Sequence, residues 1–240
     1  MATVEINVAG LPANTQASFR ELGQLLAELM GEELLGFTAF GGWLADDALY
    51  AGTPARSVLV LSRIDLRKLD QLAARGPRFG QRGLAAPLLM TPPYIAASRD
   101  VFPLELLEIQ QTGILMLGAD HFGPLTFAPT DVRLQCEREL KSTLIQLRQG
   151  LLAVAGQHKR LADVCRAEGD RLMRVLRGLL DLKGTTATGA GQLVAATAAQ
   201  TGLPLETLKA AVANPAGVDF AAFEHLYGEL VALAEYVDKL

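Results

Sequence analysis

The stretch FGGWLADDALYAGTPARSVLVLS, residues 40–62, decides the fold. It contains the end of one apolar strand, the pair Gly41-Gly42, a polar loop, and a second apolar strand over residues 57–61. Glycine lets the backbone approach a bound group closely, as in a phosphate-binding turn, although an ordinary tight turn after a strand is the simpler interpretation of a Gly-Gly pair. The second strand is apolar at successive positions, which is typical of a strand covered on both faces. The stretch therefore predicts two strands of one sheet joined through a glycine turn, which is either an ordinary tight turn or one that binds a phosphate.

The rest of the first half alternates between helix and strand patterns, which predicts a small mixed sheet covered by helices. The first helix follows LPANTQ, with Asn14 or Thr15 as its expected N-cap. Asp65 is the expected N-cap of the helix DLRKLDQLAAR. The remaining predicted elements are a strand in LLGFTAF (34–40), a strand in APLLMTP (86–92), a short helix in PYIAAS (93–98), and two apolar strand-like segments in 101–118 separated by Gln111-Thr112-Gly113.

The second half is almost entirely helical in pattern. Its first helix is expected to begin at Thr130 or Asp131, and a second is expected to end where Gly184 takes the left-handed position after it. Three further amphipathic segments follow, which together predict a helical bundle. The sequence thus predicts an α/β (α+β) domain with a mixed sheet over residues 1–128 and an all-α helical bundle over residues 129–240.

Composition limits the classes of function. The chain has 240 residues, a net charge of -4 and two cysteines, so nucleic acid is an unfavoured partner. Cys136 and Cys165 both lie in helical patterns and are expected to be reduced thiols of a cytoplasmic protein. The first residues lack the pattern of a signal peptide, and no uncharged apolar stretch reaches membrane-spanning length. We therefore expect no membrane partner.

Three stretches resemble one family. They are Phe40-Gly41-Gly42, the segment RSVLVL (56–61), and the run DVFPLELLEIQQTGILMLGAD followed by RLQCERELKSTLIQLRQ. Together they resemble the nucleotidyltransferase-fold proteins of the DNA polymerase β superfamily, in particular bacterial members with a C-terminal helical bundle such as the aminoglycoside nucleotidyltransferases. That resemblance implies a Gly-Ser turn that binds a triphosphate and an Asp-x-Asp strand whose carboxylates share one face. Those carboxylates would hold two divalent ions, and a third acid would follow on a nearby strand.

The sequence departs from this pattern at the residues that carry the chemistry. Gly42 stands where the family has serine, and Val58 and Val60 stand where it has the paired aspartates. The resemblance leaves Glu105 as the candidate third acid, with Glu108 as its competitor. On a strand these two glutamates would face opposite sides, so at most one of them could face the glycine turn.

The predicted site therefore consists of Glu105 as the catalytic acid and of Gly41, Gly42 and Ser57 as the phosphate-binding residues. No metal site is predicted, because one carboxylate cannot build a two-metal clamp.

Three functions follow as expectations. The first is a catalytically degenerate nucleotidyltransferase-like protein, without a cofactor, that binds a nucleotide, a small molecule or a protein partner. The second is an active enzyme that uses Mg²⁺ to transfer a nucleoside monophosphate from an NTP to a small acceptor, with Asp46, Asp47, Asp65 and Glu105 replacing the missing acids. The third is a structural protein that forms a homodimer and binds no ligand.

Two further features have alternative interpretations. The segment ARGPRFGQRG (74–83) is the densest basic stretch, and it is either a solvated helix end or a contact for phosphate or single-stranded nucleic acid. Trp43, next to the glycines, would either stack on a base or fill the pocket.

Overall fold

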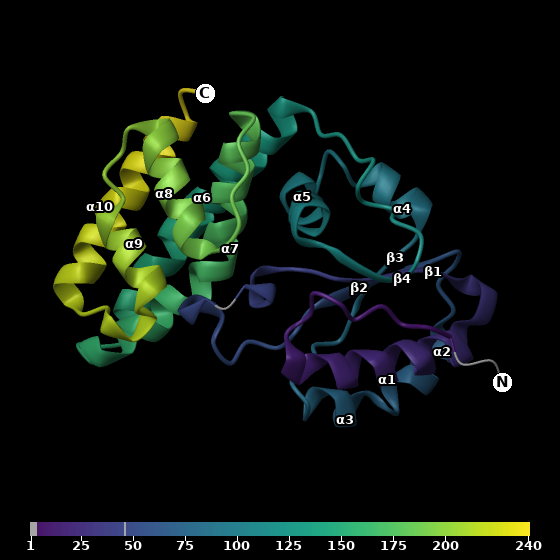
Figure 1. Ribbon diagram of the computed structural model, residues 1–240. Coiled ribbons are helices and arrows are strands. Elements are labelled where there is room, and N and C mark those ends of the chain that lie inside the picture. The colour runs from purple at the N-terminus through teal and green to yellow at the C-terminus, as the bar shows by residue number, and fades with distance from the viewer. Residues whose placement is uncertain (1–3, 46) are drawn as a thin grey trace. The chain divides into compact units, whose positions relative to one another are not determined.

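The computed structural model describes residues 4–45 and 47–240 (Figure 1). Asp46, which the active-enzyme hypothesis needs, lies outside the described residues. The chain divides into two compact units. The first contains residues 1–44, 52–99 and 108–126, and the second contains 45–51, 100–107 and 127–240. The second unit thus includes two early segments that the sequence-based division at residue 128 placed in the first domain.

The first unit is built on a four-stranded mixed sheet with the strand order β3-β2-β1-β4. β1 pairs antiparallel with both β2 and β4, whereas β2 and β3 are parallel. The predicted mixed sheet is therefore confirmed, and β2 has a neighbour on each side and is buried at every residue. The strands are β1 (Leu34–Ala39), β2 (Ser57–Leu61), β3 (Leu88–Met90) and β4 (Ile114–Gly118).

Helices cover both faces of this sheet (Figure 1). On one face, Phe19 and Leu26 of α1 form a core cluster with Phe37 of β1 and Leu59 of β2. The short helix α4 and the last residues of α5 lie on the other face. The helices that supply residues to this unit are α1 (Ala13–Met30), α2 (Leu66–Ala73), α3 (Gly76–Gly80), α4 (Pro92–Ala97) and the C-terminal part of α5 (Pro103–Thr112).

The prediction of a strand around Glu105 is wrong, because this segment forms the helix α5. A short apolar run cannot be assigned to strand or buried helix from its periodicity alone, and this run is buried on most sides. Its Leu, Glu and Gln residues are good helix formers. The strand begins only after Gly113, as β4. Glu105 and Glu108 therefore lie three residues apart on a helix, which places them on neighbouring sides and not on opposite faces.

Two of the three predicted N-caps are wrong. α1 begins at Ala13, with Pro12 at the N-cap and without a side-chain cap. α6 begins at Pro129, before Thr130 and Asp131, because proline is well suited to the first position of a helix, where its missing N–H costs nothing. The third prediction is confirmed: the carboxylate of Asp65 accepts hydrogen bonds from the first-turn backbone N–H groups of α2.

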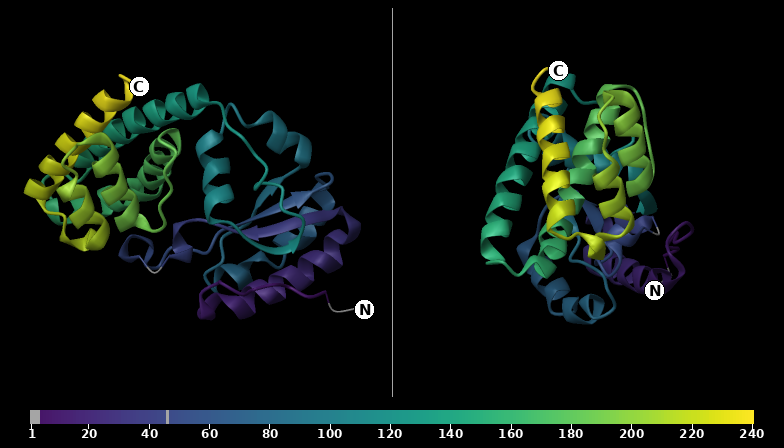
Figure 2. Two further views of the ribbon diagram at one scale, coloured as in Figure 1. Left: turned by 45° about the horizontal axis from the view of Figure 1, so that its top comes forward. Right: turned by 90° about the vertical axis from the view of Figure 1, so that its left-hand side faces the viewer.

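The second unit contains the predicted helices, and its core is formed by their apolar stripes. Figure 2 shows α6, α7 and α10 packed together, and α8 and α9 complete the group. The expected end of α7 is confirmed, because Gly184 follows its last residues with φ 64°. Cys136 and Cys165 are free thiols within the bundle. The helices are α6 (Pro129–Ala153), α7 (Leu161–Leu182), α8 (Ala190–Thr201), α9 (Glu206–Ala213) and α10 (Phe220–Val237).

Close packing in the second unit requires a glycine in α7. A Cβ atom at Gly178 would lie 2.3 Å from Cδ2 of Leu104 and 2.9 Å from Sγ of Cys136. We expect Gly178→Val to lower the free energy of unfolding by about 1–3 kcal/mol, because the added methyl groups overpack this contact. Chemical denaturation followed by circular dichroism measures the change.

Gly228→Val in α10 is the matched control. A Cβ at Gly228 meets no atom within 4 Å, and valine is a slightly better helix former than glycine. The free energy of unfolding should stay within about 0.5 kcal/mol of the parent. Equal losses in the two variants would contradict the packing role of Gly178.

Candidate functional site

The glycine turn, Phe40–Gly42, is closed by contacts from within the chain. Gly41 has φ 107°, and its N–H donates to Oγ1 of Thr112 at 2.9 Å. The Thr112 hydroxyl in turn donates to the carbonyl of Glu108 at 2.7 Å. A Cβ at Gly41 would lie 2.5 Å from Nη2 of Arg56. Glycine is favoured here because φ 107° is a conformation that other residues rarely adopt, and it also leaves space for the Arg56 guanidinium.

Arg56 forms an ion pair beside this turn. Its Nη2 lies 2.7 Å from Oε1 of Glu108, a residue that is only 4% exposed. The guanidinium also lies over the ring of Phe40, 4.8 Å from the ring centroid, a favourable cation–π arrangement. A buried carboxylate is stable only when it is paired or hydrogen-bonded. Of the two candidate acids, it is Glu108 and not Glu105 that the structure pairs with Arg56 beside the glycine turn.

Alternation along β2 decides which side chains share a face. Arg56, Val58 and Val60 lie on one face, and the residues between them lie on the other. Both valines are at most 1% exposed, so the two positions where the resemblance expects carboxylates are part of the packed interior. Ser57 lies on the opposite face, the one that packs against α1 through Leu59. The prediction that Ser57 joins the glycine turn in a phosphate site is therefore not supported by the strand geometry, and its buried Oγ has no hydrogen-bond partner in the described chain.

Two glycines next to the Val58–Val60 face lie close to other side chains. A Cβ at Gly36 would lie 3.6 Å from Cβ of Val60 and 3.3 Å from Cδ2 of His121. A Cβ at Gly113 would lie 3.0 Å from Cγ2 of Thr38. Among residues 4–45 and 47–240, no group of three or more His, Cys, Asp or Glu side chains is placed to hold a metal ion.

The remaining described candidate acids have structural partners of their own. Glu105 accepts a hydrogen bond from Nε2 of Gln135 at 2.7 Å in the second unit. Asp47, also in the second unit, accepts one from the N–H of Ala190 at 2.7 Å. Asp65 is the N-cap of α2 in the first unit. Asp47 and Asp65 therefore accept hydrogen bonds at the starts of helices, and Glu105 accepts one from a buried side-chain amide.

Trp43 is packed within the first unit. Its ring stacks on Phe19, with 5.6 Å between ring centroids, and its Nε1–H donates to the carbonyl of Phe40 at 2.7 Å. The ring and the N–H donor of Trp43 therefore both have partners within the protein. Of the two interpretations of Trp43, the structure favours the one in which it fills space.

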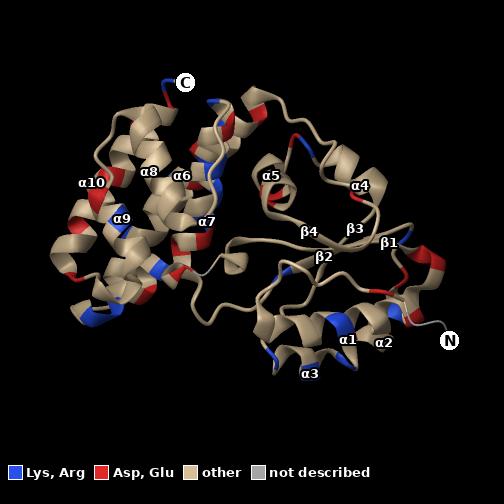
Figure 3. Cartoon of the chain, in the orientation of Figure 1, with Lys and Arg blue, Asp and Glu red and all other residues tan. Residues whose placement is uncertain are grey.

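The basic stretch, which includes the blue segments at α3 in Figure 3, is also engaged internally. Arg78 and Arg82 both pair with the carboxylate of Glu21 on α1, and the Arg78 guanidinium lies 4.9 Å from the ring centroid of Phe79. This arrangement fits the simpler interpretation, a solvated helix end that packs on α1.

Comparison with known proteins does not assign the chain to a family. No protein-family model matches the chain, and no curated protein is significantly similar to it. In the described part of the chain, none of the helices combines the length and the apolar character needed to cross a membrane.

The ion pair between Arg56 and Glu108 gives a test of this site. We expect Glu108→Gln to lower the free energy of unfolding by about 1–3 kcal/mol, because the change leaves a partly buried guanidinium with a weaker partner. Urea denaturation of the intact chain measures this loss.

Glu137→Gln on α6 is the control, since Glu137 also forms ion pairs but near the surface. Surface pairs contribute little, so this change should cost no more than about 1 kcal/mol. If Glu108→Gln is no more harmful than the control, the pair does not hold the glycine turn together.

Proposed function

We propose that this protein is a nucleotidyltransferase-like protein that does not transfer nucleotides and acts instead by binding a small molecule or a protein partner. The observation that carries the proposal is the burial of Val58 and Val60 on the face of β2 where the family resemblance expects metal-binding carboxylates. The mixed sheet followed by a helical unit is compatible with this assignment.

The chemistry of nucleotidyl transfer argues against an active site here. Phosphoryl transfer relies on metal ions and fixed positive charges that neutralise the developing charge on the phosphate oxygens. Two buried valines supply neither a metal ligand nor a charge. The nearby carboxylate of Glu108 is neutralised by Arg56 at 2.7 Å, so it is a poor ligand for a divalent ion.

The local contacts also argue against a triphosphate as the ligand. The N–H of Gly41, which a phosphate would need, already donates to Thr112. Arg56, whose guanidinium lies over the ring of Phe40 in this turn, is paired with Glu108. A nucleotide would have to displace both contacts, so an uncharged small molecule or a protein surface is the better class of ligand. Homodimerisation through the bundle or the sheet stays a prediction.

A thermal-shift experiment with ATP, GTP, CTP and UTP, each with and without Mg²⁺, tests the proposal. We expect no Mg²⁺-dependent rise of the melting temperature with any of the four. A ligand present at about 100 times its dissociation constant would add roughly 2.7 kcal/mol of stability, which this method detects readily. A Mg²⁺-dependent shift would refute the non-catalytic function and favour the active-enzyme alternative.

Restoring the missing acids tests the resemblance itself. The double variant Val58→Asp, Val60→Asp should lose stability, because it buries two like charges next to each other. If the family alignment is correct, Mn²⁺ should recover part of that loss by binding both carboxylates, whereas the parent protein should not respond to Mn²⁺. Differential scanning calorimetry with and without Mn²⁺ measures both effects.

The matched control is Leu59→Asp, Leu61→Asp, which places two carboxylates on the opposite face of the same strand. It should be destabilised as well but should gain nothing from Mn²⁺. Equal recovery of the two double variants, or recovery of neither, would show that the alignment of β2 with the Asp-x-Asp strand is wrong.

A further inference from the structure

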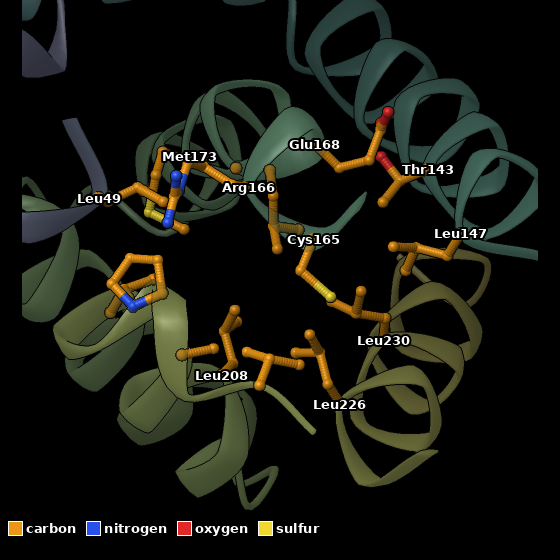
Figure 4. Close-up of a pocket in the computed structure, with 16 residues that line it drawn as sticks. Leu49, Thr143, Leu147, Cys165, Arg166, Glu168, Met173, Leu208, Leu226 and Leu230 are labelled. Carbon is orange, nitrogen blue, oxygen red and sulfur yellow. The ribbon is translucent and has the colours of Figure 1, made fainter. Parts of the chain in front are cut away.

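The first unit contains an open pocket between α4 and the loop of residues 119–126, which follows β4. Its volume is about 280 Å³, close to the lower end of the range of about 300–1,000 Å³ that is usual for small-molecule sites. All of its lining residues belong to the first unit, so the pocket depends on this unit alone. A cavity in the second unit, surrounded by the side chains of Figure 4, has only about 30 Å³ and room for about two water molecules. The pocket beside α4 is therefore the better candidate for a ligand site.

The wall that the loop forms is held in place by hydrogen bonds. Nε2 of Gln110 on α5 lies 2.8–3.1 Å from three carbonyl oxygens of the loop, those of Phe122, Gly123 and Leu125. The carboxylate of Asp120 accepts hydrogen bonds from the N–H groups of Phe122 and Gly123 at 2.9 and 3.0 Å. A wall that is already ordered lowers the entropy cost of binding a ligand.

Most of the lining is apolar. It comes from α4 on one side and from the loop on the other, and it consists of Pro92, Ile95, Ala96, Pro124 and Leu125. Such a surface gains free energy when a hydrocarbon group replaces water against it. The lining therefore favours a ligand with an apolar body.

Arg99 gives the pocket its positive charge. Among the described residues that line the pocket, it is the only arginine or lysine, and none is an aspartate or glutamate. Its Nε donates to the carbonyl of Ala96 at 3.2 Å, which holds the guanidinium at the end of α4. In the part of the chain that the structure describes, neither Nη1 nor Nη2 has a hydrogen bond or an ion pair. The two N–H groups at this end of the guanidinium match the two oxygens of a carboxylate.

His121 also lines the pocket, but its Nε2 is not available to a ligand. This atom is buried and has no hydrogen-bond partner among residues 4–45 and 47–240. A Cβ at Gly36 would lie 3.3 Å from Cδ2 of the same ring, so this edge of the imidazole faces β1 and not the pocket. A single histidine without a cysteine or a carboxylate beside it in the lining does not suit a metal ion. Recognition of a polar group in the pocket therefore depends on Arg99.

We infer that this pocket binds a small monocarboxylate with an apolar body. Its carboxylate accepts hydrogen bonds from Nη1 and Nη2 of Arg99, and its hydrocarbon part lies against α4 and the loop. A phosphate monoester carries about two negative charges at neutral pH, and the single cation of the pocket matches it less well.

This pocket differs from the glycine turn, where the cation Arg56 already has a carboxylate partner. The inference rests on the pocket and not on the nucleotidyltransferase resemblance. Its failure would therefore leave the proposed function untouched.

Three probes test the inference on the full chain. Benzoate carries a carboxylate and an apolar ring, benzamide has nearly the same shape without the charge, and acetate has the charge without the ring. Titrations followed by ¹H–¹³C spectra of the methyl groups give the affinities, read at Ile95 and Leu125 in the pocket lining. We expect benzoate to give saturable shifts there and to bind about threefold to tenfold more tightly than benzamide, the worth of one exposed charged pair. Acetate should bind about tenfold more weakly than benzoate, because it leaves the apolar lining uncovered.

Arg99→Gln removes the charge and keeps a polar side chain. Arg99 is exposed, so the variant should fold as stably as the parent, and its preference for benzoate over benzamide should disappear. Arg67→Gln is the matched control, because Arg67 is an exposed arginine of α2 that does not line the pocket. It changes the net charge by the same amount and should keep the preference of the parent.

Four results would overturn the inference. They are the absence of saturable shifts with benzoate at Ile95 and Leu125, equal affinities for benzoate and either of the other probes, a preference for benzoate that persists in folded Arg99→Gln, and loss of that preference in Arg67→Gln. The comparison of the three probes on the parent protein needs no variant, so it decides the matter even if Arg99→Gln fails to fold.

Discussion

The guanidinium of Arg56 connects three elements of the first unit: the start of β2, the turn after β1 and the end of α5. It needs a carboxylate within reach, and Glu108 provides one at 2.7 Å from the last turns of α5. It also lies beside the turn after β1, where Gly41 has φ 107°, a conformation that favours glycine. Because Arg56 directly precedes β2, the pair fixes the start of that strand against both the turn and the helix. A phosphate-binding turn would use the same glycine and the same cation, but here both are bound to the protein itself.

This arrangement explains which parts of the fold were predictable. The strands β1, β2 and β3, the helices of the second half and the cap at Asp65 follow from local patterns of apolar and capping residues, and the structure confirms them. α5 was not predictable as a helix, because its run of buried residues has no periodicity that separates strand from helix. The wrong caps of α1 and α6 share another cause, since proline at or beside the first position replaced the polar residue that the pattern favours.

The candidate site was only partly predictable from the sequence. Gly41, Gly42 and the two valines were recognised as a turn and a buried strand, and both expectations hold. The sequence did not show which residues contact the glycine turn. Arg56 and Glu108 are 52 positions apart, and only tertiary contact shows that they form a pair. The expectation that Glu105 and Glu108 face opposite sides failed for a different reason, because it assumed strand geometry for a segment that is helical.

Both units contain buried polar atoms that have no hydrogen-bond partner among the described residues: Ser57 Oγ and His121 Nε2 in the first, and Thr143 Oγ1 in the second. The glycine turn is different. In the first unit, Gly41, Thr112, Arg56 and Glu108 bond to one another, so a ligand would have to break existing bonds before it formed new ones. Because those bonds would have to be replaced before any binding energy was gained, the glycine turn is an unfavourable place for a ligand on energetic grounds.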